Sequence, residues 1–359
     1  MRSIYQLVAG FRSGDAISNA ALQMRTVFRS WGCRSDILAR PSSVGVDRRD
    51  DARDLYETVP KIKEDDIAVL HLSIGNPVNF VFRDLKCRKA IVYHNITPAH
   101  YFKVLNSSTA ADLAEGRRHL AMLADAAELN IADSGYNAAE LTEASYRDAK
   151  VLPLPIDINT FVGGAVDPNS CARLRDGHFN ILFVGRLAPN KKIEDILTVM
   201  YFLLKIEPRA RFIHAGSHDG LEMYTGLLRA HANTLGLPMK NYQFLGSLPQ
   251  DCLNACYVSA DAFLCMSEHE GFCAPLIEAM LYKLPVLALG STAIPETLGG
   301  AGVLFSQPPD FPLIAETVAE VLHNEPLRKA IVARQDKRLE AIRNRDLGAE
   351  MRALFEPLL

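Results

Sequence analysis

The sequence lacks the features that mark several common classes of protein. Lysines and arginines number 39 against 42 aspartates and glutamates, so the formal net charge is -3 and no basic excess favours nucleic-acid binding. No apolar run approaches the roughly 20 residues of a membrane-spanning helix, and the N-terminal segment lacks the apolar core of a signal peptide. These absences predict a cytoplasmic protein, either dissolved or attached to the inner face of the cell membrane.

The cysteines do not form the pattern of a disulfide framework. There are 7 of them, an odd number, and no two are spaced as CxxC. In a chain of 359 residues this usage is typical of reduced thiols in a cytosolic protein. Cys252 and Cys256 are one helical turn apart, but no matching pair of ligands follows at zinc-site spacing. Packing is therefore their expected role.

Several motifs that announce a cofactor or a metal are also absent. Neither GxxxxGK(S/T) nor GxGxxG occurs, which excludes the usual phosphate-loop and dinucleotide fingerprints. His269 and Glu270 begin like HExxH, but Cys273 occupies the second histidine position and rules out that metalloprotease motif. The acidic triplet 64–66 precedes a predicted strand instead of ending one, so a solvated charge cluster explains it best. We therefore expect no required metal ion.

The chain is long enough for two hydrophobic cores, because 359 residues exceed what one core usually supports. Apolar runs alternate with helical patterns, and most runs are apolar throughout, as in strands buried on both faces of a parallel sheet. The first series of predicted strands is Ile4–Ala9, Ser35–Ala39, Ala68–Ser73, Ala90–His94, Leu129–Ala132 and Lys150–Leu154. The second is Asn180–Val184, Arg211–Ala215, Gln243–Leu245, Ala262–Met266, Pro285–Leu289 and Val303–Phe305.

The segment Asp157–Gly177 separates the two series, has no clear period, and is predicted to be an interdomain linker. Two series of strands interleaved with helices predict an α/β protein with two doubly wound, Rossmann-like domains facing a central cleft. We expect an N-terminal domain at residues 1–160 and a C-terminal domain at residues 161–340. A final helix at residues 341–359 is expected to cross back to the N-terminal domain.

One loop of the second series carries the strongest chemical signal. It follows the predicted strand Ala262–Met266, and a helix should begin near Pro275, because proline suits the first helical position. A helix N-terminus can hold a diphosphate through its N–H groups and its positive dipole end. Glu270 precedes this site and Glu278 is expected in the first helical turn, so they could bind a sugar and a ribose diol. Taken alone, Glu270 is best interpreted as a solvated loop carboxylate and Glu278 as a residue that complements the helix dipole.

The complete string changes that weighting, because it resembles the E-x7-E motif of glycosyltransferase family 4, usually E-G-F-G-x-P-x-x-E-A. Here it is Glu270-Gly-Phe-Cys-Ala-Pro-Leu-Ile-Glu278-Ala, and its one departure is cysteine in place of glycine. For that cysteine a tolerated small residue is favoured over a reactive thiol. The resemblance implies that the whole turn contacts the donor, through Gly271, Phe272, Cys273 and Ala274 as well as the two glutamates.

A second segment, Phe183-Val-Gly-Arg-Leu-Ala-Pro-Asn-Lys191, resembles the V-G-R-L-x-x-x-K segment of the same family. Arg186 and Lys191 lie in a predicted strand-to-helix loop, where two cations could neutralise a departing diphosphate; Lys192 is the adjacent alternative. The resemblance also implies donor contacts from Gly216, in a turn after a strand, and from Ser247 and Leu248, in a segment along the nucleotide base.

The N-terminal half matches the family more loosely. Gly14 and Asp15 lie between the first strand and the first helix, where the family commonly has a glycine-rich turn near the donor phosphates. His94 ends a predicted strand and is a candidate catalytic residue, although a lone histidine is more often structural. Ser134 belongs to another segment that resembles a cleft-side contact of the family.

The resemblance implies a GT-B enzyme that is a retaining, metal-independent hexosyltransferase. Its donor would be a nucleotide-diphosphate sugar, GDP-mannose being favoured and a UDP-sugar the alternative, with no further cofactor. The N-terminal domain would bind the acceptor, a glycan or lipid-linked saccharide in surface polysaccharide synthesis. Front-face displacement, in which the departing phosphate takes the acceptor's proton, is the implied route. The alternatives are a nucleotide-sugar epimerase, a phosphorylase and a non-catalytic nucleotide-sugar-binding subunit.

Two groups of cations bear on the acceptor. Such runs are usually solvated faces, but they could also contact anionic lipid and favour a lipid-diphosphate acceptor. The first is Arg83, Lys86, Arg88 and Lys89, and the second is Arg328, Lys329, Arg334, Lys337, Arg338, Arg343 and Arg345. The sequence leaves the oligomeric state open.

Overall fold

The computed structural model describes residues 2–156, 158 and 163–359, which form two compact units. Unit 1 comprises Met1–Lys103, Ser107–Asp157 and Arg345–Leu359, and unit 2 comprises Val104–Asn106 and Ile158–Asn344. The expected domain boundary at residues 160 and 161 lies outside the described residues. Among the helices described, none is both long and apolar enough to cross a membrane.

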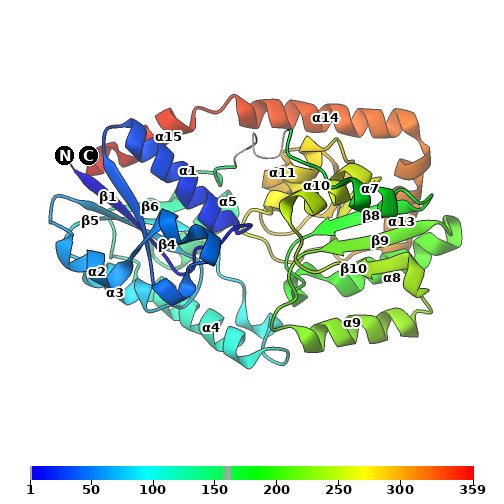
Figure 1. Ribbon diagram of the computed structural model, residues 1–359, viewed down its shortest axis with the longest axis horizontal. Coiled ribbons are helices and arrows are strands. Elements are labelled where there is room, and N and C mark those ends of the chain that lie inside the picture. The colour runs from blue at the N-terminus through cyan, green and yellow to red at the C-terminus, as the bar shows by residue number, and fades with distance from the viewer. Residues whose placement is uncertain (1, 157, 159–162) are drawn as a thin grey trace. The chain divides into compact units, whose positions relative to one another are not determined.

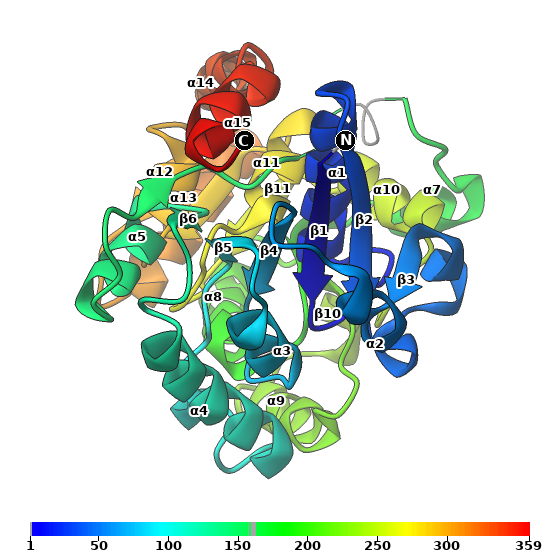
Figure 2. The same ribbon diagram turned by 90° about the vertical axis from the view of Figure 1, so that its left-hand side faces the viewer.

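Unit 1 is built on a parallel sheet of seven strands in the order β3-β2-β1-β4-β5-β6-β7, most of which can be followed in Figure 2. The strands are β1 (Ser3–Val8), β2 (Arg34–Ala39), β3 (Ala52–Asp54), β4 (Ile67–Leu72), β5 (Arg88–Tyr93), β6 (Leu129–Ala132) and β7 (Lys150–Val151). The helices are α1 (Ala16–Ser30), α2 (Leu55–Thr58), α3 (Val78–Asp84), α4 (Ser107–Met122), α5 (Gly135–Glu143) and α15 (Leu347–Phe355).

The core of unit 1 includes the C-terminal end of the chain. Helix α1 turns Ala20, Met24 and Phe28 inward, as apolar residues at helical spacing do. Phe28 meets Phe355 of α15 edge to face, with ring centroids 5.0 Å apart. Figure 1 shows α15 beside α1 within this unit. The N-terminal sheet is thus covered in part by the last helix of the chain.

Unit 2 has a second parallel sheet, in the order β10-β9-β8-β11-β12-β13. The strands are β8 (Phe179–Val184), β9 (Ala210–Ala215), β10 (Tyr242–Phe244), β11 (Ala262–Cys265), β12 (Val286–Leu289) and β13 (Val303–Phe305). The helices are α7 (Pro168–Leu174), α8 (Ile193–Ile206), α9 (Glu222–Thr234), α10 (Gln250–Ser259), α11 (Ala274–Leu281), α12 (Ile294–Leu298), α13 (Phe311–His323) and α14 (Glu325–Arg343). Two doubly wound parallel sheets confirm the predicted α/β class.

Two local expectations were wrong. The segment expected to be a linker contains α7, whose N-cap Asp167 accepts a hydrogen bond from the backbone N–H of Ser170 and whose first turn holds a proline. Residues 157 and 159–162 of that segment lie outside the described residues. Glu278 is not in the first turn of its helix, because α11 begins at Ala274 and has no acidic residue in its first turn.

Candidate functional site

The strand order of unit 2 reverses between β8 and β11, which are neighbours in the sheet although β9 and β10 intervene in sequence. In a doubly wound sheet, ligands bind outside the carboxyl ends of the strands at this point of reversal. The loop after β8 contains Arg186 and Lys191, and the loop after β11 contains Glu270. Topology alone therefore brings the two strongest sequence motifs to one edge of one sheet.

The two loops meet in a largely buried ion pair. Lys191 Nζ donates to Glu270 Oε2 at 2.6 Å, and the two side chains are 19% and 9% exposed. Burial tends to lower the pKa of Lys191, but the negative charge of Glu270 and the hydrogen bond to it outweigh burial, so the pKa lies above its ordinary value. The lysine is therefore a fixed cation in the loop after β8.

Hydrogen bonds that the sequence did not suggest hold the same loops in register. Asn190 is buried, donates from Nδ2 to the carbonyl of His269 at 3.0 Å, and accepts from Glu268 N–H at 2.9 Å. From the loop after β12, Thr292 Oγ1 accepts from Glu270 N–H at 2.9 Å. The sequence could have indicated this positioning role only through the presence of an asparagine, Asn190, in the loop after β8.

The other lysine of the loop has different partners. Lys192 Nζ lies 3.3 Å from a carboxylate oxygen of Glu268 and 3.6 Å from one of Glu194. Its backbone, with φ of 52°, is left-handed and begins α8. Lys191 and Lys192 therefore bind separate carboxylates, and only Lys191 contacts a glutamate of the E-x7-E string.

Gly216 explains how the loops after β8 and β9 approach each other. Its φ is +150°, and an ideal Cβ there would lie 1.9 Å from the carbonyl oxygen of Gly185. Gly185 N–H donates to Ala215 O at 3.0 Å, and Gly216 N–H donates to Gly246 O at 2.9 Å. Only glycine fits this contact. The exposed Arg186 follows directly, 3.4 Å from the carbonyl of Asp219 through Nη2.

The second glutamate of the motif is bound inside unit 2. Glu278 Oε2 accepts from the hydroxyl of Tyr257 in α10 at 2.6 Å. Burial raises the pKa of Glu278 above its ordinary value, and the hydrogen bond from Tyr257 opposes that rise. Tyr257 was not predicted, since nothing in the sequence links α10 to α11.

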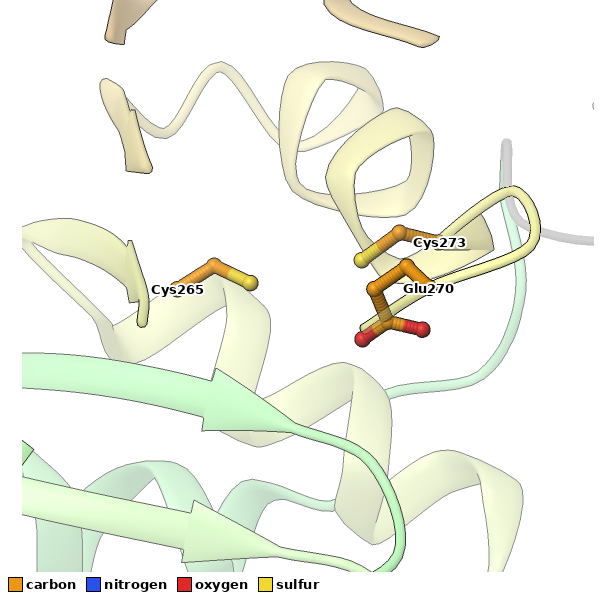
Figure 3. Close-up of side chains that lie close together, drawn as sticks. All are labelled: Cys265, Glu270 and Cys273. Carbon is orange, nitrogen blue, oxygen red and sulfur yellow. The ribbon is translucent and has the colours of Figure 1, made fainter. Parts of the chain in front are cut away.

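Cys273 is the N-cap of α11 and adopts a left-handed conformation, with φ of 70° and ψ of 62°. Its side chain makes no capping hydrogen bond. The sulfur lies near that of Cys265, the last residue of β11, and near the Glu270 carboxylate, as Figure 3 shows. The hydrogen bond with Cys265 and then burial raise the pKa of the Cys273 thiol well above its ordinary value, which disfavours a reactive thiolate there.

The remaining predicted donor contacts of unit 2 lie in loops or at helix starts on the same edge. Gly271 and Phe272 complete the loop after β11, and Ala274 is the first residue of α11. The exposed Ser247 and the half-buried Leu248 lie between β10 and α10. That these residues contact the donor stays a prediction.

In unit 1 the predicted contacts also follow strand ends, but two of them cap helices. Gly14 has φ of +75° and precedes α1. Asp15 is the N-cap of α1, and its Oδ2 accepts from Ser18 N–H at 2.8 Å and from Ser18 Oγ at 2.6 Å. Ser134 is the N-cap of α5, where its Oγ accepts from Asn137 N–H at 3.2 Å. Asp15 and Ser134 thus have a structural use as helix caps, which the resemblance to the family did not indicate.

His94 belongs to a buried chain of hydrogen bonds. Its Nδ1 lies 2.7 Å from Asp133 Oδ2 and its Nε2 lies 2.8 Å from His71 Nδ1, while His71 Nε2 lies 3.0 Å from Gln6 Oε1. Since Gln6 Nε2 donates to Ala21 O, its oxygen must accept from His71. Both ring nitrogens of His94 are thus engaged inside unit 1. Its catalytic role stays a prediction, and the contacts favour a positioning role.

Comparison with known proteins agrees with this geometry. Residues 172–338, which contain both loops and both glutamates, match the family of glycosyl transferases group 1. This part of the chain, which is less than half of it, is similar to the group 1 glycosyltransferases. The predicted resemblance is therefore confirmed, although the match itself does not assign roles to individual residues.

Two curated relatives of this chain are mannosyltransferases. The O-antigen chain mannosyltransferase B of Escherichia coli is 30% identical over 155 residues, 43% of this chain and 39% of the relative. The GDP-mannose:cellobiosyl-diphosphopolyprenol alpha-mannosyltransferase of Xanthomonas oryzae pv. oryzae is 32% identical over 141 residues, 39% of this chain and 34% of the relative. The matched part of this chain thus spans 39% and 34% of the length of these relatives.

A solved structure extends the likeness in fold to nearly the whole chain. HepE of Anabaena, in complex with UDP-glucose, aligns with a TM-score of 0.74 over 99% of both chains at 18% identity. This likeness confirms the predicted GT-B fold.

Internal contacts engage part of the predicted basic tail of this chain. In α14, Arg338 donates from Nε to Thr297 O at 3.1 Å and from Nη2 to Glu296 O at 3.0 Å. Arg345 binds Glu350 through Nη2 at 2.5 Å. These two cations stabilise the fold, which weakens the case that the tail as a whole is a lipid-binding face.

Proposed function

We propose that the chain is a retaining hexosyltransferase that moves a sugar, with mannose favoured, from a nucleotide-diphosphate donor to an acceptor saccharide. The observation that carries the proposal is the Lys191–Glu270 pair, with its 2.6 Å contact at the point where the strand order of unit 2 reverses. A buried cation beside a carboxylate suits a ligand whose diphosphate is anionic and whose sugar presents hydroxyl donors.

The roles follow from the charges. Lys191 and Arg186 stabilise the negative charge that develops on the departing diphosphate, with the N-terminus of α11 as a further source of positive potential. Glu270 accepts hydrogen bonds from the sugar hydroxyls, and Glu278 from the ribose diol. Lys191 is then released from Glu270 to the phosphate when the donor enters, because one ammonium cannot serve both at full strength. No side chain is required as a general base if the departing phosphate takes the acceptor's proton.

The relatives guide the choice of donor and acceptor. The Xanthomonas relative is named for GDP-mannose and for a diphosphopolyprenol acceptor, and the Escherichia relative for an O-antigen chain. These names support GDP-mannose and a lipid-linked or glycan acceptor in surface polysaccharide synthesis. HepE binds UDP-glucose, which keeps a UDP-sugar as the alternative donor.

Turnover of matched variants tests the central assignment. Glu270→Gln and Lys191→Ala should each lower turnover at least about 100-fold, the scale of losing one preorganised charge contact in a transition state. Glu268→Gln is the control, because Glu268 belongs to the neighbouring Lys192 pair on the same loop. Near-normal transfer by Lys191→Ala, together with a severe loss in Lys192→Ala, would overturn the choice of lysine.

Three further measurements test the finer parts of the proposal. Screening donors for protection against thermal unfolding should select GDP-mannose over UDP-sugars, because a ligand that binds only the folded state raises its stability. Proton NMR of the product should show the anomeric configuration of the donor. Transfer should persist in EDTA, and its loss on chelation would contradict a metal-independent mechanism.

A further inference from the structure

Cys265, Glu270 and Cys273 form a compact group of metal-ligating side chains. Their two sulfur atoms and a carboxylate oxygen lie within 4.8 Å of one another, and all three residues are buried. Within the part of the chain that the structure describes, this is the one cluster of its kind. Figure 3 shows that the residues approach from the end of β11, from the loop and from the start of α11. The group is therefore held by three separate backbone positions.

The spacing and the donor types fit a tetrahedral thiophilic cation. Zinc binds thiolates at about 2.3 Å and carboxylates at about 2.0–2.2 Å, so ligand atoms around it are about 3.5–3.8 Å apart. The upper bound of 4.8 Å on the present distances exceeds that separation by only about 1 Å. Two thiolates and one carboxylate suit zinc, whereas magnesium prefers an octahedron of oxygens. Three protein ligands leave a fourth position open.

The backbone of Cys273 gives an independent reason to assign a use to its side chain. A residue with a Cβ pays about 1–2 kcal/mol in the left-handed region, where glycine would be unstrained. Cys273 adopts this conformation at the N-cap without making a capping hydrogen bond. The strained position instead holds its sulfur toward Cys265 and Glu270 (Figure 3). Strain of this kind clusters at functional sites.

The surroundings also balance the charge of such a complex. Two thiolates and one carboxylate around a divalent cation carry one net negative charge. The Lys191 ammonium, 2.6 Å from Glu270, compensates that charge from outside the ligand set. The metal-bound group and its lysine are therefore neutral together, which limits the cost of burying them.

We propose that Cys265, Glu270 and Cys273 form an inhibitory site for a thiophilic divalent cation of the zinc class. A cation bound there engages the carboxylate that the donor sugar needs, so metal and donor exclude each other. This exclusion rests on the proposed function, whereas metal binding itself does not. The cation is a competing ligand and takes no part in transfer.

A titration of the reduced, metal-free chain with Co²⁺ tests the site directly. Thiolate-to-cobalt absorption should saturate at one ion per chain, and both Cys265→Ser and Cys273→Gly should weaken binding at least about 10-fold. Cys273→Gly suits the left-handed backbone, so its loss of metal has no explanation in misfolding. Cys252→Ser is the control, since Cys252 and Cys171 lie near Cys256 and form a separate group of thiols. Mg²⁺ should not displace Co²⁺.

Two outcomes of the titration overturn the site: no thiolate band, or a band that survives in Cys265→Ser and Cys273→Gly but disappears in Cys252→Ser.

The exclusion is tested separately with GDP-mannose as the donor. Zn²⁺ should raise its apparent KM at least about 10-fold in the wild-type chain and leave the KM of Cys273→Gly unchanged. Unaltered KM in the wild type refutes the inhibition. A wild-type chain that transfers no sugar refutes the proposed function and leaves the Co²⁺ result standing.

Discussion

Gly216 and the carbonyl group of Gly185 lie so close that one added methyl group probes the architecture of the site. An ideal Cβ on Gly216 would lie 1.9 Å from the Gly185 oxygen and 2.5 Å from its carbonyl carbon. These are backbone atoms, so no side-chain rotation relieves the overlap, and the loop after β8 has to move. We therefore expect Gly216→Ala to displace the segment that carries Arg186 and to lower both stability and turnover.

The magnitude follows from three contributions. A side chain at a φ of +150° strains the backbone by about 1–3 kcal/mol. The hydrogen bonds from Gly185 N–H and Gly216 N–H cross between loops, and losing each costs about 0.5–1.5 kcal/mol. Unit 2 should lose about 2–6 kcal/mol of unfolding free energy if none of this is recovered by relaxation. A displacement of about 1 Å at the site should lower turnover about 100-fold.

Urea unfolding followed by circular dichroism, together with a transfer assay, measures both effects. Gly226→Ala is the matched control, because Gly226 is an exposed residue of α9 and its added Cβ meets no atom within 4 Å outside the helix backbone. That change should raise helix stability by about 0.5–1 kcal/mol. Wild-type stability and wild-type turnover in Gly216→Ala would refute the close contact between the two loops.

Three further variants probe buried polar groups. Tyr257→Phe removes the hydrogen bond that opposes the raised pKa of Glu278, so the carboxylate should take up a proton at a higher pH than in the wild type. On acidification, donor affinity should therefore begin to fall at a higher pH. An unchanged pH profile of donor affinity would contradict this. Burial lowers the pKa of His214 to about 4, below its ordinary value of 6.5. The stability linked to it is complete above about pH 6.5 and is lost, up to about 3 kcal/mol, as the pH falls toward 4. His214→Leu should flatten that loss in urea unfolding at several pH values. Asp133→Ala leaves the His94 N–H unpaired and should cost unit 1 about 1–3 kcal/mol, seen as a lower urea midpoint.

The strand framework was predictable wherever burial on both faces makes most of a run apolar, as in β4, β5 and β8. Strand β3 was missed because Ala52–Asp54 is a short and polar edge strand. Helix α7 was missed although Asp167 and Pro168 form a capping signal, since it has only seven residues in a segment without other periodicity.

The site was predictable as a set of residues but not as a set of contacts. Motif spacing singled out Lys191 and Glu270, yet their ion pair depends on β8 lying beside β11, which no local pattern reveals. The hydrogen bond between Tyr257 and Glu278 joins two helices, so it likewise depends on tertiary packing that no local pattern reveals. Nothing in the sequence pointed to Cys265 as a site residue, because a cysteine at the end of a buried strand usually belongs to the hydrophobic core.

The packing of α15 in unit 1 has a consequence for synthesis on the ribosome. Domains generally fold in the order in which they leave the ribosome, with the N-terminal domain first. Here the core of unit 1 includes Met351, Phe355 and Leu358 beside Phe28, so it stays incomplete until residue 358 has been made. Unit 2 is complete at Asn344, before that point. A nascent chain should therefore protect its C-terminal sheet from protease before its N-terminal one.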